Sequence, residues 1–211
     1  MTDSPSRPAH WDRAYERPAD AVSWYQPEAR TSLELIRAAE ISPDQAILDV
    51  GGGASTLVDG LLERGYRDLT VLDVAPKSLE VARARLGPAG EPVHWIVADI
   101  TSWLPARTYR CWHDRAVFHF LTETSERDAY RRGLARGVEA GGAIIIATFA
   151  EDGPERCSGL PVRRYSAQQL EAEFRGLARL VEFRHETHRT PAGGTQSFVF
   201  VRLVREPREQ P

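Results

Sequence analysis

Short, largely apolar runs alternate with segments of helical periodicity along most of the chain. The runs resemble strands of a parallel sheet that is buried on both faces. They cover residues 47–50, 69–72, 93–98 and 143–149, with a further run inside residues 109–121. Helical spacing of apolar positions covers residues 28–39, 57–64, 76–86 and 126–138. This alternation predicts an α/β fold with a doubly wound, mostly parallel sheet.

Residues 177–187 and 196–205 form a last pair of apolar runs. The segment between them contains Pro191, Gly193 and Gly194, which are turn residues. This arrangement predicts a hairpin of two antiparallel strands.

The first apolar run ends in Asp49 and Val50 and is followed at once by Gly51, Gly52 and Gly53. A glycine turn between a strand and a helix lets a ligand lie against bare backbone at the helix N-terminus. A carboxylate at the strand end would repel a pyrophosphate and attract an ammonium or sulfonium group. The alternative is that Asp49 only caps the next helix.

Two further acids follow two later strand runs. Asp73 ends the run 69–72, where a carboxylate can accept hydrogen bonds from both hydroxyls of a ribose. Asp99 ends the run 93–98, where it can take an adenine amine while Ile100 packs on the ring. Each acid alone would be a turn or cap residue. Together they fit S-adenosylmethionine, a ligand with an amine, a ribose and an adenine but without phosphate.

With these motifs the sequence resembles the class I S-adenosylmethionine-dependent methyltransferases over nearly its whole length. Residues 47–53 resemble the family's cofactor loop, residues 71–73 its ribose-binding strand end and residues 97–100 its adenine segment. The resemblance implies a Rossmann-like sheet of seven strands that ends in an antiparallel pair. It also implies a single domain, 1–211, with an N-terminal lid of residues 1–40 and a core of residues 41–205. The implied cofactor-binding residues are Trp11, Trp24, Asp49, Gly51, Gly52, Gly53, Asp73, Val74, Asp99, Ile100 and Ala116.

Aromatic residues gather before the first strand. Trp11 and Tyr15 have the i, i+4 spacing of one helix face, and Trp24 and Tyr25 follow. In the family that the sequence resembles, a similar segment closes over the cofactor and shapes the acceptor pocket. We therefore count Tyr15 among the candidate catalytic residues. The alternative is that these rings only cover the edge of the sheet.

The fourth strand region contains an adjacent acid and arginine, Asp114 and Arg115, inside an apolar run. Buried charges need partners, so we expect residues 114–119 to line the acceptor site. His119 is the candidate general base and Arg115 a second candidate catalytic residue. The alternative for His119 is a core histidine that hydrogen bonds to backbone. A base is optional, because methyl displacement can proceed by proximity alone.

The long connection 150–165 contains Cys157, Arg163 and Arg164. Long loops in compact domains are often functional, so the two arginines are candidates for holding an acidic acceptor. Cys157 is expected to be a thiol without chemistry. His185, His188 and Gln196 are expected to be solvated.

Composition sets limits on function. The net charge of -3 gives no basic surface for nucleic acid, and no apolar run reaches the length of a membrane span. Two cysteines without metal-ligand spacing predict neither a disulfide framework nor a metal site. We therefore expect a cytoplasmic protein without nucleic-acid or membrane partners, acting on a small molecule or a protein side chain.

Three functions remain open from the sequence. The first is methyl transfer to nitrogen, oxygen or sulfur. The chain carries no Asn-Pro-Pro-Tyr-type tetrapeptide after the fourth strand, which argues against nucleobase or glutamine-amide acceptors. The second is a nicotinamide-dependent oxidoreductase, against which Asp49 and Thr56 argue, since Thr56 replaces the third glycine of a dinucleotide motif. The third is a protein that binds an adenosine ligand without catalysis.

Overall fold

A computed structural model describes residues 7–207 of the chain. Its main sheet has seven strands in the order β3-β2-β1-β4-β5-β9-β8. The pairs among β1 to β5 are parallel, whereas β9 runs antiparallel to both β5 and β8. These strands are β1 (Ile47–Val50), β2 (Leu69–Asp73), β3 (His94–Val97), β4 (Tyr109–Arg115), β5 (Val138–Phe149), β8 (Ala178–Arg189) and β9 (Thr195–Arg205). The predicted seven-stranded sheet with a C-terminal antiparallel pair is confirmed.

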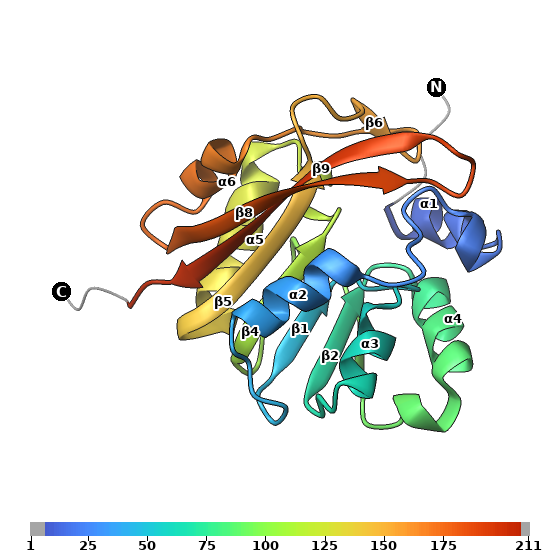
Figure 1. Ribbon diagram of the computed structural model, residues 1–211, viewed down its shortest axis with the longest axis horizontal. Helices are drawn as coiled ribbons and strands as arrows, with labels where there is room; N and C mark the ends of the chain where they lie inside the picture. Colours follow the sequence, from blue (N-terminus) through green and yellow to red (C-terminus); the bar gives the residue numbers. More distant parts are fainter. Residues whose placement is uncertain (1–6, 208–211) are drawn as a thin grey trace.

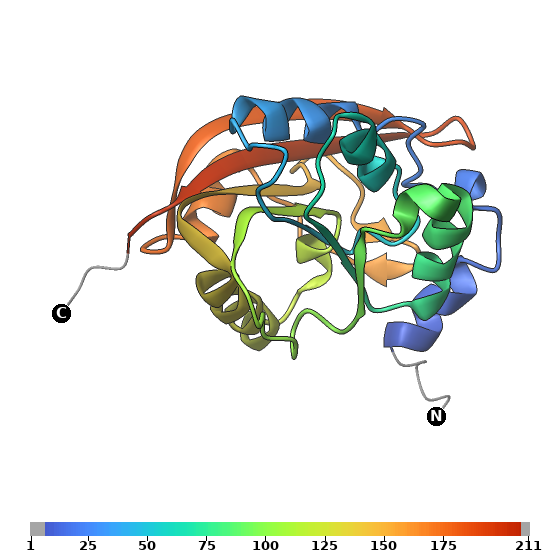
Figure 2. The ribbon, with the colours of Figure 1, turned by 90° about the horizontal axis from the view of Figure 1, so that it is seen from below.

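Helices cover both faces of this sheet. Figure 1 shows the β8–β9 hairpin running across the upper part of the molecule, with its turn near α1, and α1 beside α4 at the right. Figure 2, seen from below, separates α2 and α3 on one face of the sheet from α5 on the other. The helices are α1 (Arg7–Ala14), α2 (Arg30–Ala38), α3 (Leu57–Glu63), α4 (Pro76–Leu86), α5 (Thr124–Gly137) and α6 (Ala167–Glu173), with short 3-10 turns at Ala19–Ala21, Gly87–Gly90 and Phe118–Phe120.

Two hydrophobic cores explain why the strand runs are continuously apolar. Successive side chains of a strand point to opposite faces, so Leu48 and Val50 pack in the core beneath α5 and α6. Ile47 lies in the second core with Leu35 of α2 and Leu57 of α3. Because the parallel strands β1, β2 and β4 are covered on both faces, they have no polar face to alternate with the apolar one, whereas the edge strand β3 is partly exposed.

The same alternation separates Asp114 from Arg115. Asp114 is fully buried and accepts hydrogen bonds from the Val117 backbone N–H (2.9 Å) and the Tyr130 hydroxyl (2.8 Å). The Tyr130 hydroxyl in turn accepts a hydrogen bond from Trp112 Nε1 at 2.8 Å. Burial raises the pKa of Asp114 to about 6. Asp114 is thus a core residue that holds the turn after β4, and the expectation that it lines the acceptor site is wrong.

The predicted long loop contains a small hairpin. Strands β6 (Arg156–Cys157) and β7 (Leu160–Pro161) pair antiparallel within residues 150–165. No apolar run predicts these strands, since each of them has only two residues. Within the described part of the chain, no helix has both the length and the apolar character needed to cross a membrane.

We predict that Tyr130→Phe destabilises the protein by about 1–3 kcal/mol, because it leaves the Asp114 carboxyl and the Trp112 N–H without their shared partner. Urea unfolding measures this loss as a lower midpoint at an unchanged slope. Tyr66→Phe, at a partly exposed position, is the matched control and should change stability by less than about 0.5 kcal/mol. Equal stability of the two variants would contradict a structural role for this hydrogen-bonded chain.

Candidate functional site

A cavity of about 450 Å³ lies at the carboxyl ends of the parallel strands. A smaller hollow of about 50 Å³ shares Tyr15, Trp24, Gly51 and Arg115 with it. The predicted site residues that line the cavity are Trp11, Tyr15, Trp24, Gly51, Asp73, Val74, Asp99, Ile100, Arg115 and Ala116. Asp49 and Gly52 line the smaller hollow. Most of the predicted residues are therefore brought together around one pair of connected spaces.

The glycine loop fits closely against its neighbours. Gly53 has a φ of +41°, and a Cβ atom built on it would lie 2.7 Å from Asp73 Oδ2 and 2.9 Å from the Tyr15 hydroxyl. A Cβ on Gly52 would meet Asp49 Oδ2. No side chain fits at either position, so bare backbone faces both acids, as a bound amino-acid and ribose group requires.

Asp49 has a partner that the sequence did not reveal. Its Oδ1 lies 2.7 Å from His113 Nδ1, and His113 Nε2 lies 2.8 Å from Ser32 Oγ. All three side chains are buried. The β1–β4 register pairs Asp49 with His113, so these two side chains point to the same face of the sheet. Asp49 does not cap the following helix, because Thr56 is the N-cap residue of α3.

Asp73 lies next to the N-terminal segment. Its Oδ1 accepts a hydrogen bond from the Ala75 backbone N–H at 2.8 Å. Burial raises the pKa of Asp73 to about 7, and the negative charge of Asp49 adds to this shift. Burial also raises the pKa of the Tyr15 hydroxyl, with a further contribution from Asp73. Tyr15 is therefore a neutral hydroxyl near the Asp73 carboxyl.

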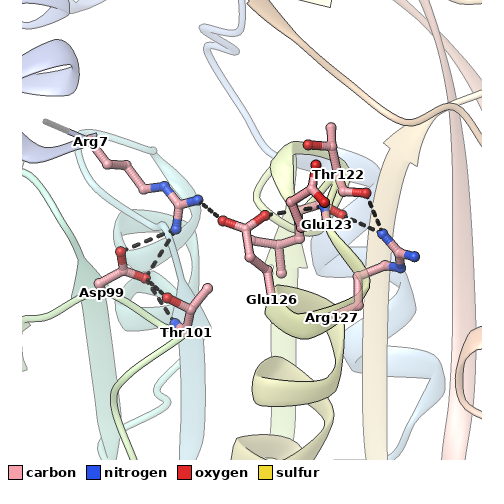
Figure 3. Close-up of polar contacts among 8 residues, drawn as sticks. Arg7, Asp99, Thr101, Thr122, Glu123, Glu126 and Arg127 are labelled. Carbon is pink, nitrogen blue, oxygen red and sulfur yellow. Dashed lines mark hydrogen bonds and ion pairs between the residues drawn. The ribbon is translucent and has the colours of Figure 1, made fainter. Parts of the chain in front are cut away.

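Asp99 is bound by Arg7 of α1 (Figure 3). Arg7 Nη1 lies 3.1 Å from Asp99 Oδ2, and Arg7 Nη2 contacts Glu126 at the start of α5. Asp99 Oδ1 also accepts hydrogen bonds from the Thr101 backbone N–H (2.9 Å) and hydroxyl (2.7 Å). Burial raises the pKa of Asp99, but the hydrogen bonds from Thr101 and the charge of Arg7 outweigh it, so this pKa lies below its usual value. Arg7 thus connects α1 to the segment after β3 and to the start of α5.

Aromatic rings close the cavity from the N-terminal side. Trp11 makes edge-to-face contacts with Trp24 and Phe120, at centroid distances of 5.7 and 5.0 Å. Tyr15 contacts Trp24 in the same way at 5.9 Å. These four aromatic residues all line the cavity. The N-terminal aromatic segment therefore covers the predicted cofactor site and does not only cover the edge of the sheet.

His119 is not placed as a base for a group in the cavity. Its side chain is fully buried and lines neither of the two spaces. The backbone N–H of Phe149 donates to His119 Nδ1 at 3.3 Å. Burial lowers the pKa of His119 to about 3, and the charge of Arg115 lowers it further. These contacts match the alternative of a core histidine, and we assign no proton transfer to it.

Three other expectations need correction. Arg163 pairs with Glu173 and Arg164 with Glu155, and neither arginine lines the cavity. His188 is buried, with its Nε2 2.8 Å from the Ser23 carbonyl oxygen, and is not solvated. The contribution of the long loop comes instead from the β6–β7 hairpin, through Cys157, Leu160 and Pro161. Burial raises the pKa of the Cys157 thiol to about 11, which keeps it protonated.

Comparison with known proteins agrees with this geometry. A family profile described as a methyltransferase domain matches residues 47–142, which contain the glycine loop and the acids Asp49, Asp73 and Asp99. Residues 47–142 are thus similar to a methyltransferase domain. A malonyl-[acyl-carrier protein] O-methyltransferase of Anoxybacillus flavithermus is 33% identical to this chain over 113 residues. That match covers 53% of this chain and 41% of the relative, so the chain matches less than half of the relative's length.

Solved structures share the fold at low sequence identity. One concerns the conversion of a disulfide bond into a thioacetal group during echinomycin biosynthesis, with a TM-score of 0.72, 22% identity and coverage of 94% of this chain and 93% of that one. Another is the glycopeptide N-methyltransferase MtfA with bound S-adenosylmethionine, with a TM-score of 0.65, 13% identity and coverage of 87% and 96%. At these identities the likeness is one of fold. Within residues 7–207 of the chain, no group of three metal-ligating side chains is placed to hold an ion.

We predict that cofactor affinity rises with pH through the pKa of Asp73. Ribose hydroxyls donate to the ionised carboxylate, and with a pKa of about 7 the ionised fraction falls about tenfold from pH 8 to pH 6. Calorimetric titration with S-adenosylhomocysteine should show a loss of affinity of that size. The matched variant Asp73→Asn should bind more weakly and without this dependence. A pH profile that survives in Asp73→Asn would contradict the assignment.

We predict that His113→Gln weakens S-adenosylhomocysteine binding by about 1.5–3 kcal/mol, because Asp49 loses the hydrogen bond that orients its carboxylate. His113→Asn is the matched comparison, since its amide can replace Nδ1 toward Asp49 while losing the contact with Ser32. Its affinity should fall less than that of His113→Gln. Calorimetry provides the measurement, with the exposed His185→Asn as a neutral control. If both His113 variants bind as the wild type does, the orienting role is excluded.

Proposed function

We propose that the protein transfers a methyl group from S-adenosylmethionine to a nitrogen, oxygen or sulfur atom of a small molecule or a protein side chain. The observation that carries the proposal is the convergence of Asp49, Asp73 and Asp99 on connected spaces beside a glycine loop that admits no side chain. A dinucleotide would bring a pyrophosphate to this loop, where the buried Asp49 would repel it.

Each acid has a separate role in the proposal. Asp73 accepts the ribose hydroxyls, Asp49 attracts the ammonium group of the methionine part, and Asp99 takes the adenine amine beside its contacts with Arg7. The part of the N-terminal segment that lines the cavity acts as the lid, in which Trp11 and Tyr15 exclude water from the bound group. When bound, S-adenosylmethionine supplies an electrophilic methyl group on its sulfonium sulfur.

The acceptor end of the cavity is largely apolar. Phe120, Cys157, Leu160 and Pro161 line it together with Arg115. These groups position an acceptor and withhold water from it, and in-line displacement then depends on proximity rather than on a base. The curated relative is described as an O-methyltransferase and one structural neighbour as an N-methyltransferase, so both acceptor atoms remain in the proposal.

The test is acceptor-dependent formation of S-adenosylhomocysteine. We expect micromolar binding of S-adenosylmethionine by calorimetry, weaker binding by Asp49→Ala, and turnover when carboxylates, amines, phenols and thiols are supplied as separate acceptor pools. Radiolabelled methyl groups should appear in the product of at least one pool. Binding without turnover in any pool would favour an adenosine-ligand binder. Tight binding of NAD, with none of S-adenosylmethionine, would favour the oxidoreductase.

A further inference from the structure

Arg115 is a buried cation at the end of β4. Its side chain is 11% exposed and lies between the N-terminal segment, β8 and β9. Its guanidinium carbon lies 4.5 Å from the centre of the Phe198 ring. The next residue, Ala116, has a φ of +69°, so the chain turns sharply away after Arg115. Arg115 lines both the cavity and the smaller hollow.

Most of its hydrogen-bonding capacity is unused. A guanidinium carries several N–H donors and no acceptor. Arg115 Nη1 donates to the Trp24 carbonyl oxygen at 3.1 Å, whereas Nε and Nη2 are buried without a hydrogen-bond partner among residues 7–207. Glu186 Oε1 is 4.0 Å from Nη2, too far for a hydrogen bond. Gln26 (2.9 Å) and Thr31 (2.5 Å) hold the Glu186 carboxylate in that position.

Leaving these donors unpaired is costly. Burial lowers the pKa of Arg115 to about 10, because the charged guanidinium loses its hydration. Arg7, the other arginine that lines the cavity, is already paired with Asp99 and Glu126. A buried arginine with free donors at a ligand cavity is suited to a planar anion, and a carboxylate matches its geometry.

The position of Asp49 identifies the most suitable carboxylate. Asp49 and Arg115 line the same small hollow, together with Gly52 and Thr56. One wall of the hollow therefore carries a buried acid and another a buried cation. A zwitterionic α-amino acid group, with its ammonium toward Asp49 and its carboxylate toward Arg115, satisfies both charges.

We propose that Arg115 is the carboxylate receptor of this site and binds the α-carboxylate of the cofactor's methionine part. This inference rests on the proposed function, because it takes S-adenosylmethionine as the ligand. Arg115 also faces the larger cavity, so an acceptor carboxylate is the second source of the same chemistry. Arg115 acts in either case by binding and orientation, and no proton transfer is assigned to it.

The experiment compares three ligands by calorimetry. S-adenosylhomocysteine carries both charges of the amino-acid group, S-adenosyl-3-thiopropylamine lacks the carboxylate, and 5′-methylthioadenosine lacks the whole group. We expect Arg115→Met to weaken S-adenosylhomocysteine about tenfold and to change the other two by less than about threefold. Retained binding of 5′-methylthioadenosine shows that the variant is folded. Arg163→Met, at a surface arginine outside the cavity, is the matched control and should bind all three as the wild type does.

A second arm separates the two sources of carboxylate. If Arg115→Met leaves S-adenosylhomocysteine affinity unchanged but abolishes binding of acetate or benzoate to the protein loaded with that ligand, the receptor serves the acceptor, and the cofactor assignment is overturned. If neither ligand class responds, or if all three adenosine ligands weaken equally, the receptor role is overturned. Failure of the wild type to bind any adenosine ligand would instead refute the proposed function itself.

Discussion

The desolvation of carboxylates at the ends of parallel strands is the constraint on which this structure depends. Asp49, Asp73 and Asp114 are all buried, and an ionised carboxylate is costly to bury unless it is paired or hydrogen bonded. Asp114 is fully occupied by a tyrosine hydroxyl and two backbone N–H groups, which makes it structural. Asp49 and Asp73 also have hydrogen-bond partners, but Asp73 borders the cavity and Asp49 the smaller hollow, where a ligand can reach them. Access to these two spaces, neither of which Asp114 lines, separates the structural acid from the candidate binding acids.

The lid follows from the same constraint. Asp99 is half-buried at the rim, and Arg7 supplies the cation that offsets its burial. Arg7, Trp11 and Tyr15 recur every four residues and so lie along one side of the N-terminal segment. Arg7 on that side pairs with Asp99 and Trp11 packs on Phe120, while Tyr15 lies near Asp73. Helix α1 and the residue after it therefore extend along the predicted cofactor site. Their ion pair and ring contacts together close the cavity.

Local patterns in the sequence were sufficient for the sheet, the helices and the acids at the strand ends. Strand β1 and helix α4 fall where the apolar runs predict them, because short buried strands and periodic helices are local signals. The side chains that pair with these acids could not be predicted from local patterns. His113 meets Asp49 across 64 positions and Arg7 meets Asp99 across 92, and such contacts follow from strand order and lid placement. Side-chain alternation along β4 places Asp114 and Arg115 on opposite faces, and this separation is a local signal of the sequence.

The burial of His119 changes how the proposed chemistry is understood. An imidazole whose pKa lies near 3 because of burial and a neighbouring guanidinium is neutral at physiological pH and a very weak base. The same guanidinium, Arg115, lines the cavity while His119 does not. The positive charge of Arg115 thus faces the cavity, whereas the imidazole of His119 does not reach it. A site built in this way favours acceptors that arrive already nucleophilic, and its catalytic contribution lies in orientation and exclusion of water.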